Sequence, residues 1–157
     1  MNLEKRASVP FSSLTGGYLY EIRESAGELW FITSKGIFWM GHTTSCCESV
    51  DIDEVFGDPE ELRGAYITEA DEPSSEGEGI KVRDFEEGYT PESYTWTFYR
   101  LQTPKGDLVI RWLGTSNGYY GEAVDFEQVD GFSDLEWLAT AATTDSDTFP
   151  GQPWRPK

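Results

Sequence analysis

The densest group of reactive side chains lies between two predicted strands. It holds the single histidine of the chain and both cysteines, in the order His42, Cys46, Cys47 and Glu48. A cysteine thiolate with a histidine base is a covalent nucleophile. Histidine and cysteine thiolates together bind zinc. These residue types therefore point to a thiol-dependent enzyme or a structural zinc site.

The spacing of the cluster disfavours both kinds of chemistry. Adjacent residues on a strand point to opposite faces, whereas zinc sites separate paired cysteines by two to four residues. Glu48 and the acids that follow it disfavour a thiolate. A disulfide between neighbouring residues is strained, so we expect reduced thiols. We expect no metal and no catalytic residue: one cysteine fills the core, the other is half-buried, and His42 bonds locally. A thiol-dependent enzyme using Cys46 or Cys47 with His42 is the alternative.

The second candidate site combines an aromatic hairpin with the polar turn after it. Hydroxyl and amide groups beside tyrosine and tryptophan rings suit a planar small molecule or a peptide. The candidate ligand-binding residues are Trp96, Trp112, Ser116, Asn117, Tyr119 and Tyr120. The residues from Gly114 to Tyr120 also suit a purely structural turn that folds two tyrosines onto the sheet. Neither glycine-rich phosphate-binding pattern is present, so we expect no nucleotide cofactor, and we expect no other cofactor.

Charge limits the partners of the protein. The formal net charge is −17, and residues 48–92 hold sixteen acidic residues against three basic ones, a local balance of −13. Such a field repels nucleic acid and anionic membranes and attracts basic protein surfaces. The alternative interpretation of this charge is that it simply keeps the surface of a folded protein soluble. We expect no direct contact with nucleic acid; an acidic DNA mimic that inhibits a nucleic-acid-binding protein is an alternative.

No apolar run or leader is long enough for a membrane span or secretory signal, so we expect a cytoplasmic protein.

The residues between these sites alternate in polarity with the period of strands. Strands are predicted over residues 18–23, 29–33, 37–42, 48–53, 66–70, 94–103, 108–113 and 122–126. The clearest is the hairpin over 94–113, in which Leu108, Ile110 and Trp112 share a face. Capping patterns predict one short helix that begins at Asp58-Pro59 and another over 133–140.

These elements predict a β-rich α+β fold with one twisted antiparallel sheet and one or two short helices. Residues 1–10 are expected to be a flexible lead-in and residues 11–130 a single domain. Residues 131–157 are expected to form a short helix and a flexible tail. Residues 71–93 read as a long acidic loop, and no internal repeat of 20 to 50 residues is evident.

Three segments together resemble a family from bacteriophages and some bacteria. They are His42 to Glu48 with the Val-x-Ile-x-Asp after it, Tyr94 to Tyr99, and Trp112 to Tyr120. In that family of small domains of unknown function, adjacent Cys-Cys-Glu and Ser-Asn-Gly-Tyr-Tyr motifs recur. The resemblance spans about residues 28–126 and implies no reaction. It implies a phage-encoded accessory protein. We expect a non-catalytic protein that binds a host protein or a small molecule in the infected cell, with counter-defence as one such role.

Overall fold

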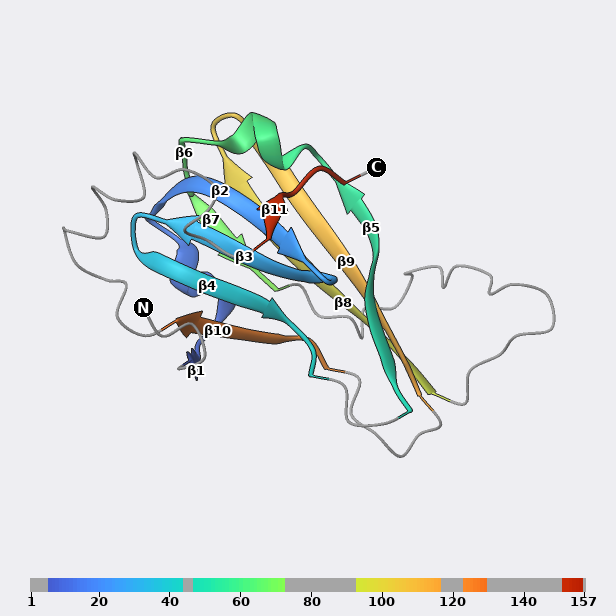
Figure 1. The fold of residues 1–157 in the computed structure, drawn as a ribbon. Coiled ribbons are helices and arrows are strands. Elements are labelled where there is room, and N and C mark those ends of the chain that lie inside the picture. The colour runs from blue at the N-terminus through green and yellow to red at the C-terminus, as the bar shows by residue number, and fades with distance from the viewer. Residues whose placement is uncertain (1–5, 44–46, 73–92, 117–122, 130–150, 157) are drawn as a thin grey trace.

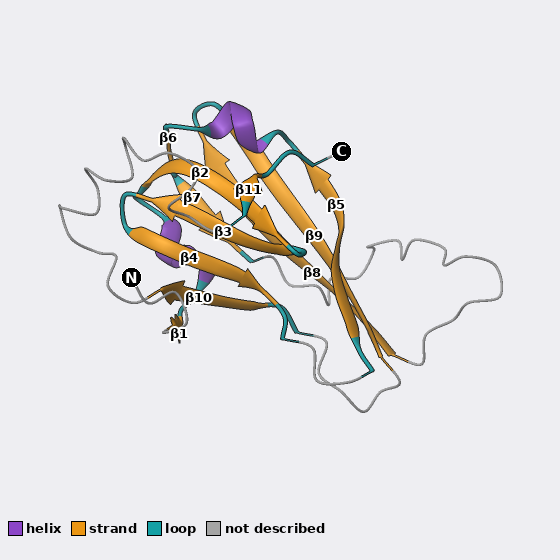
Figure 2. Ribbon diagram, viewed as in Figure 1, coloured by secondary structure: helices purple, strands orange, loops and turns teal. Residues whose placement is uncertain are grey.

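The computed structural model describes residues 6–43, 47–72, 93–116, 123–129 and 151–156. Within these ranges the chain consists of strands and two short 3-10 turns (Figure 2). The strands are β1 (Arg6–Ser8), β2 (Tyr18–Ser25), β3 (Glu28–Thr33), β4 (Gly36–Gly41), β5 (Ser49–Phe56), β6 (Ala65–Tyr66), β7 (Glu69–Asp71), β8 (Ser93–Thr103), β9 (Gly106–Ser116), β10 (Asp125–Val129) and β11 (Gln152–Pro153). The turns are η1 (Phe11–Leu14) and η2 (Pro59–Leu62).

The strands form two antiparallel sheets, which lie in two layers (Figure 1). Sheet A has the order β1-β10-β4-β3-β2-β11, with β6 also paired to β2, and sheet B has the order β5-β9-β8-β7. The prediction of a β-rich antiparallel fold is confirmed, but the prediction of a single sheet with helices is wrong. Each sheet has a face of large apolar side chains, and two such faces are buried together only when the sheets pack against each other.

The core lies between the two sheets. Phe31 and Phe38 of sheet A and Tyr99, Ile110 and Trp112 of sheet B are each at most 1% exposed and belong to one cluster. Burial of a side chain of this size stabilises the fold by roughly 1.5–3 kcal/mol. A second, smaller cluster lies on the other face of sheet A, so the central strands β3 and β4 are apolar on both faces.

The helical segments are shorter than predicted. The start at Asp58-Pro59 is confirmed, because the Asp58 carboxylate accepts a hydrogen bond from the Glu60 amide at 3.0 Å, but the segment is a single 3-10 turn. The predicted helix over 133–140 and most of the predicted acidic loop lie outside the described residues. No helix in the described part of the chain is long and apolar enough to cross a membrane.

Both ends of the chain differ from the expected flexible segments. Arg6–Ser8 forms β1 against β10, and Gln152–Pro153 forms β11 against β2. Trp154 is 7% exposed and packs in the main core. The buried Arg23 guanidinium donates to the carbonyl of Gly151 and fixes the same segment. Trp154 anchors the carboxyl-terminal segment, and the Arg6 guanidinium lies over the Trp39 ring at β1, which explains why these short strands are held.

The two sheets are built from two copies of one unit, contrary to the expectation of no internal repeat. Segments 11–24 and 59–72 both begin with a 3-10 turn, continue through a glycine with positive φ and end in strand residues. Identical residues recur 48 positions apart as Leu14 and Leu62, Gly16 and Gly64, Tyr18 and Tyr66, Glu21 and Glu69, and Glu24 and Glu72. The sheet pairings repeat as well, since Ile22 faces Phe31 in sheet A as Ala70 faces Leu101 in sheet B.

The two copies meet around a pseudo-twofold axis. The Gly16 amide donates to the Ile67 carbonyl at 2.9 Å, and the equivalent Gly64 amide donates to the Leu19 carbonyl at 2.6 Å. Tyr18 and Tyr66 face each other across this axis with ring centroids 5.3 Å apart. In each copy the last strand crosses to the other copy's sheet: β5 pairs with β9, and β10 pairs with β4.

Candidate functional site

The His42 cluster lies where the chain crosses from sheet A to sheet B. His42 follows β4, and its Nδ1 lies 2.8 Å from the carbonyl oxygen of Ala123. Its Nε2 lies 3.2 Å from Oε1 of Glu48, whose side chain is 1% exposed. Because a carbonyl oxygen only accepts, Nδ1 carries a hydrogen and donates it to Ala123. His42 therefore joins three chain segments.

The structure does not assemble a thiol and a base from this cluster. Cys47 is exposed and disulfide-bonded, whereas reduced and at least half-buried cysteines were expected. A disulfide sulfur is neither a nucleophile nor a thiolate ligand. Both ring nitrogens of His42 already face oxygen acceptors. Cys46 lies outside the described residues. Among the residues that the structure describes, no three His, Cys, Asp or Glu side chains are grouped to hold a metal ion.

The aromatic residues of the second candidate site lie on opposite faces of sheet B. Trp112 is 1% exposed and belongs to the core between the sheets. Trp96 pairs with Leu113, one position out of phase with Trp112, and points to the outer face. There its ring lies 4.8 Å from the Arg111 guanidinium. Ser116 is buried at the end of β9. These residues do not line one pocket, and Asn117, Tyr119 and Tyr120 lie outside the described residues.

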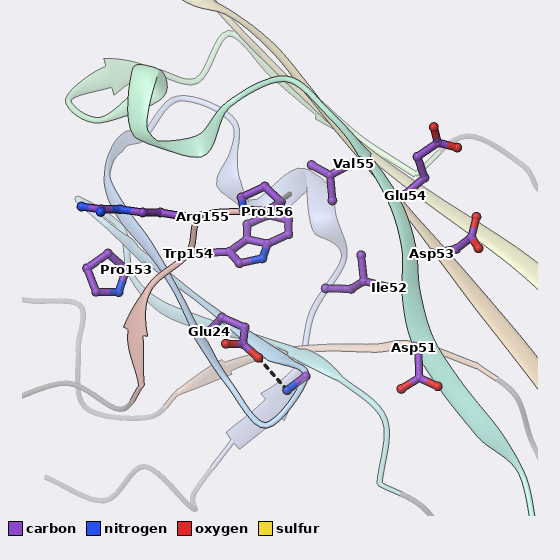
Figure 3. A pocket seen from close by; sticks show the side chains of 11 residues that line it. Glu24, Asp51, Ile52, Asp53, Glu54, Val55, Pro153, Trp154, Arg155 and Pro156 are labelled. Atoms are coloured by element: carbon purple, nitrogen blue, oxygen red, sulfur yellow. Dashed lines mark hydrogen bonds between the residues drawn. The ribbon is translucent and has the colours of Figure 1, made fainter.

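A groove that the sequence did not indicate runs along β5 (Figure 3). It has a volume of about 540 Å³ and lies between β5 at the edge of sheet B and two parts of sheet A, the β2–β3 turn and the carboxyl-terminal segment. It is lined by Glu24, Gly27, Asp51, Ile52, Asp53, Glu54, Val55, Pro153, Trp154, Arg155 and Pro156.

The two faces of β5 carry different side chains, apolar on one face and acidic on the other. Ile52 and Val55 point toward Trp154 and Pro156, as Figure 3 shows, and pack against the core. Asp53 and Glu54 point to the opposite side of the strand. This alternation follows from the period of a strand, with one register shift between Ile52 and Glu54. The groove therefore has an apolar floor and an acidic outer rim.

The charge of the groove remains negative after its ion pairs are counted. Both Asp53 and Glu54 lie 2.5 Å from Nη2 of Arg111. The side chain of Arg155 is 76% exposed and forms a loose ion pair with Glu60 at 3.5 Å. The four lining carboxylates and the one lining guanidinium, Arg155, sum to a formal charge of −3, and Arg111 beside Asp53 and Glu54 reduces it to −2. A cationic ligand would add favourable ion pairs along this rim.

The sequence of one known family matches most of the chain. That family is a domain of unknown function, DUF7448, and the match covers residues 12–126. The chain belongs to the DUF7448 family. No curated protein and no solved structure matches it. The match confirms that the chain resembles a small-domain family of unknown function. It includes β2 to β9 and the start of β10, whereas most of β10 and the carboxyl-terminal wall of the groove lie beyond it.

One signal could have led from sequence to the groove. Trp154 stands among prolines and a glycine in a segment that otherwise reads as a tail. A tryptophan buries up to about 250 Å² and is seldom free of a packing partner in a folded chain. Its position could have suggested that the carboxyl end packs on the domain. Nothing in the local sequence shows that it packs beside β5.

Proposed function

We propose that this DUF7448 protein is a non-catalytic binding protein and that its groove accepts a basic segment of another protein. The observation that carries the proposal is the groove along β5, with an apolar floor and a rim of net negative charge. Apolar contact supplies affinity, and complementary charge supplies specificity and fast association. The chain's net charge of −17 adds long-range attraction for a basic partner.

The kind of partner follows from the same features and from the sequence resemblance. A phage accessory protein acting in the cytoplasm of its host would meet basic host proteins, including those that bind nucleic acid. An acidic surface that occupies such a protein would act as a DNA mimic. The small-molecule alternative has less support, because Trp96 and Trp112 lie on opposite faces of sheet B. The thiol-dependent alternative lacks a described thiolate, since Cys47 is disulfide-bonded.

Two charge-matched variants test the proposal. The groove variant Asp51→Asn with Glu54→Gln removes two carboxylates from the rim. The control variant Glu69→Gln with Asp107→Asn removes two exposed carboxylates from β7 and β9, outside the groove lining. Both variants change the net charge equally, so long-range attraction is matched.

The measurement is the Kd of a fluorescent Lys-Val-Lys-Val-Lys-Val peptide by anisotropy at 0.05 and 0.3 M salt. We expect the groove variant to bind about fivefold more weakly than the control, since each exposed ion pair contributes roughly 0.2–1 kcal/mol. We also expect wild-type binding to weaken with salt, because screening shortens the Debye length. Equal losses in both variants would show that only bulk charge attracts the peptide and would refute the proposal.

A further inference from the structure

The pseudo-twofold axis makes the outer edges of β5 and β10 equivalent. β5 is the last strand of sheet B on the side of β9, and β10 pairs with β4 at the equivalent place in sheet A. The outer edge of β10 is covered by β1. Within the described residues no strand covers the outer edge of β5. Equivalent edges of one repeated unit are thus paired in one copy and, among the strands that the structure describes, unpaired in the other.

The covered edge shows what kind of strand fits. β1 is three residues long and runs antiparallel to β10, with Arg6 opposite Val129 and Ser8 opposite Glu127. The Arg6 guanidinium lies 4.1 Å from the ring centroid of Trp39 and 3.5 Å from the Glu127 carboxylate. The protein therefore already holds a short basic strand at one of these edges, through main-chain pairing and an arginine on the outer face.

The outer edge of β5 offers the same two features, main-chain groups for pairing and carboxylates on the outer face. An edge strand directs the N–H and C=O groups of alternate residues away from its sheet, ready to pair with another strand. β5 is eight residues long, so it presents about 26 Å of edge at roughly 3.3 Å per residue. Asp51 and Glu54 pair with β9 residues that face outward, as Glu127 does in sheet A. An added strand would have its outer side chains beside these carboxylates.

We infer that the partner segment binds as an additional antiparallel strand on β5, with lysine or arginine at alternate positions and apolar residues between them. This inference rests on the proposed function and names the form of the ligand at the same site. The apolar side chains of the segment face Ile52, Val55 and Trp154 on the groove floor. Its basic side chains face Asp51 and Glu54 on the rim. Main-chain hydrogen bonds provide affinity that does not depend on the partner's exact sequence.

Peptides with the same composition separate strand addition from simple charge attraction. The alternating peptide Lys-Val-Lys-Val-Lys-Val places lysines on one face of a strand, whereas Lys-Lys-Lys-Val-Val-Val does not. We expect the alternating peptide to bind at least tenfold more tightly, by anisotropy with the wild-type protein. Equal affinities would refute strand addition and leave the proposed binding of basic segments intact. Failure of both peptides to bind would refute the proposed function as well.

Methylation of the peptide backbone provides the second arm of the test. One derivative carries N-methyl groups on its three lysines and another on its three valines. Only one of these sets faces β5 in a paired strand, because the amides of alternate residues point to opposite edges. We expect one derivative to lose at least tenfold in affinity and the other to keep it. Similar affinities for both derivatives would contradict main-chain pairing.

Discussion

At the scale of single residues, one buried tyrosine couples stability to pH. Tyr99 is 1% exposed in the core, and its hydroxyl donates to the Val124 carbonyl at 3.4 Å. Burial raises the pKa of Tyr99 well above its usual value near 10, and the nearby carboxylates of Glu72 and Asp125 raise it further. The neutral phenol is therefore the form that the folded protein holds.

The raised pKa of Tyr99 predicts how the free energy of unfolding declines at alkaline pH. The folded-state pKa of Tyr99 lies above the unfolded value, so its contribution is fully present below pH 10 and is lost as the pH rises beyond it. In Tyr99→Phe we expect a slightly lower free energy of unfolding at pH 7 and a shallower decline between pH 10 and 11.5. Urea unfolding at several pH values measures this. Parallel pH profiles for the variant and the wild type would show that Tyr99 does not carry the shift.

For the candidate site residues, some side-chain positions could be predicted from the sequence and others could not. The strand alternation that places Leu108, Ile110 and Trp112 on one face is confirmed. The same alternation could not tell which face of the hairpin is the core, so Trp96 and Trp112 were assigned to one pocket although they face opposite ways. The local hydrogen bond of His42 to Glu48 agrees with the sequence expectation, whereas its main-chain partner Ala123 lies 81 positions away and cannot be read from the local sequence.

At the scale of elements, the two hairpin turns are built alike. Thr33 Oγ1 donates to the Gly36 carbonyl at 2.9 Å, and Thr103 Oγ1 donates to the Gly106 carbonyl at 2.8 Å. Each hydroxyl also accepts from the amide two positions on, at 3.1 Å. The glycines have φ values of 122° and 132°, which disfavour any other residue.

The lysine of each turn then holds the neighbouring 3-10 turn of its own copy. Lys35 Nζ donates to the Thr15 carbonyl at 2.7 Å, just after η1, and Lys105 Nζ donates to the Arg63 carbonyl at 2.8 Å, just after η2. A cation suits the carbonyl end of a helical turn. The pattern Thr-x-Lys-Gly therefore joins the hairpin and the 3-10 turn in both sheets.

Because the two turns are alike, equivalent substitutions in them are expected to lower the free energy of unfolding by similar amounts. We expect Thr33→Val and Thr103→Val each to lower the free energy of unfolding by about 0.5–1.5 kcal/mol, because each leaves a turn amide and carbonyl without the hydroxyl. Thr115→Val in β9 is the control outside the turns and should change stability by less. Urea titration at neutral pH checks the three variants. Loss in only one of the two turns would show that the copies are not energetically equivalent.

Element positions were largely predictable, but their repetition was not. Period-two alternation and Gly turns located β2 to β5 and the β8–β9 hairpin. The repeat escaped detection because the copies differ in spacing: Leu14 and Thr33 are 19 residues apart, whereas Leu62 and Thr103 are 41 apart. The five identities between segments 11–24 and 59–72 stand out as a repeat once the backbone pairing shows that the two segments are equivalent.

At the scale of the whole molecule, sequence patterns show which strands have an apolar face but not which faces meet. A two-layer arrangement depends on long-range contacts such as Phe11 with Tyr99, whose ring centroids are 4.9 Å apart. The same holds for the groove, whose walls come from β5 and from the segment around Trp154 about one hundred residues later. The charge of the chain predicted a basic host protein as one possible kind of partner, and the fold supplies the groove in which we propose that it binds.

The central claim is that a basic segment binds in the groove along β5. The most direct test is titration of the ¹⁵N-labelled protein with the Lys-Val-Lys-Val-Lys-Val peptide, followed by amide chemical shifts. We expect the largest changes at residues 49–56 and at Gln152, Trp154 and Arg155, and small changes on β7 and β8. Changes concentrated on β7 and β8, or spread evenly over all acidic surfaces, would contradict the claim.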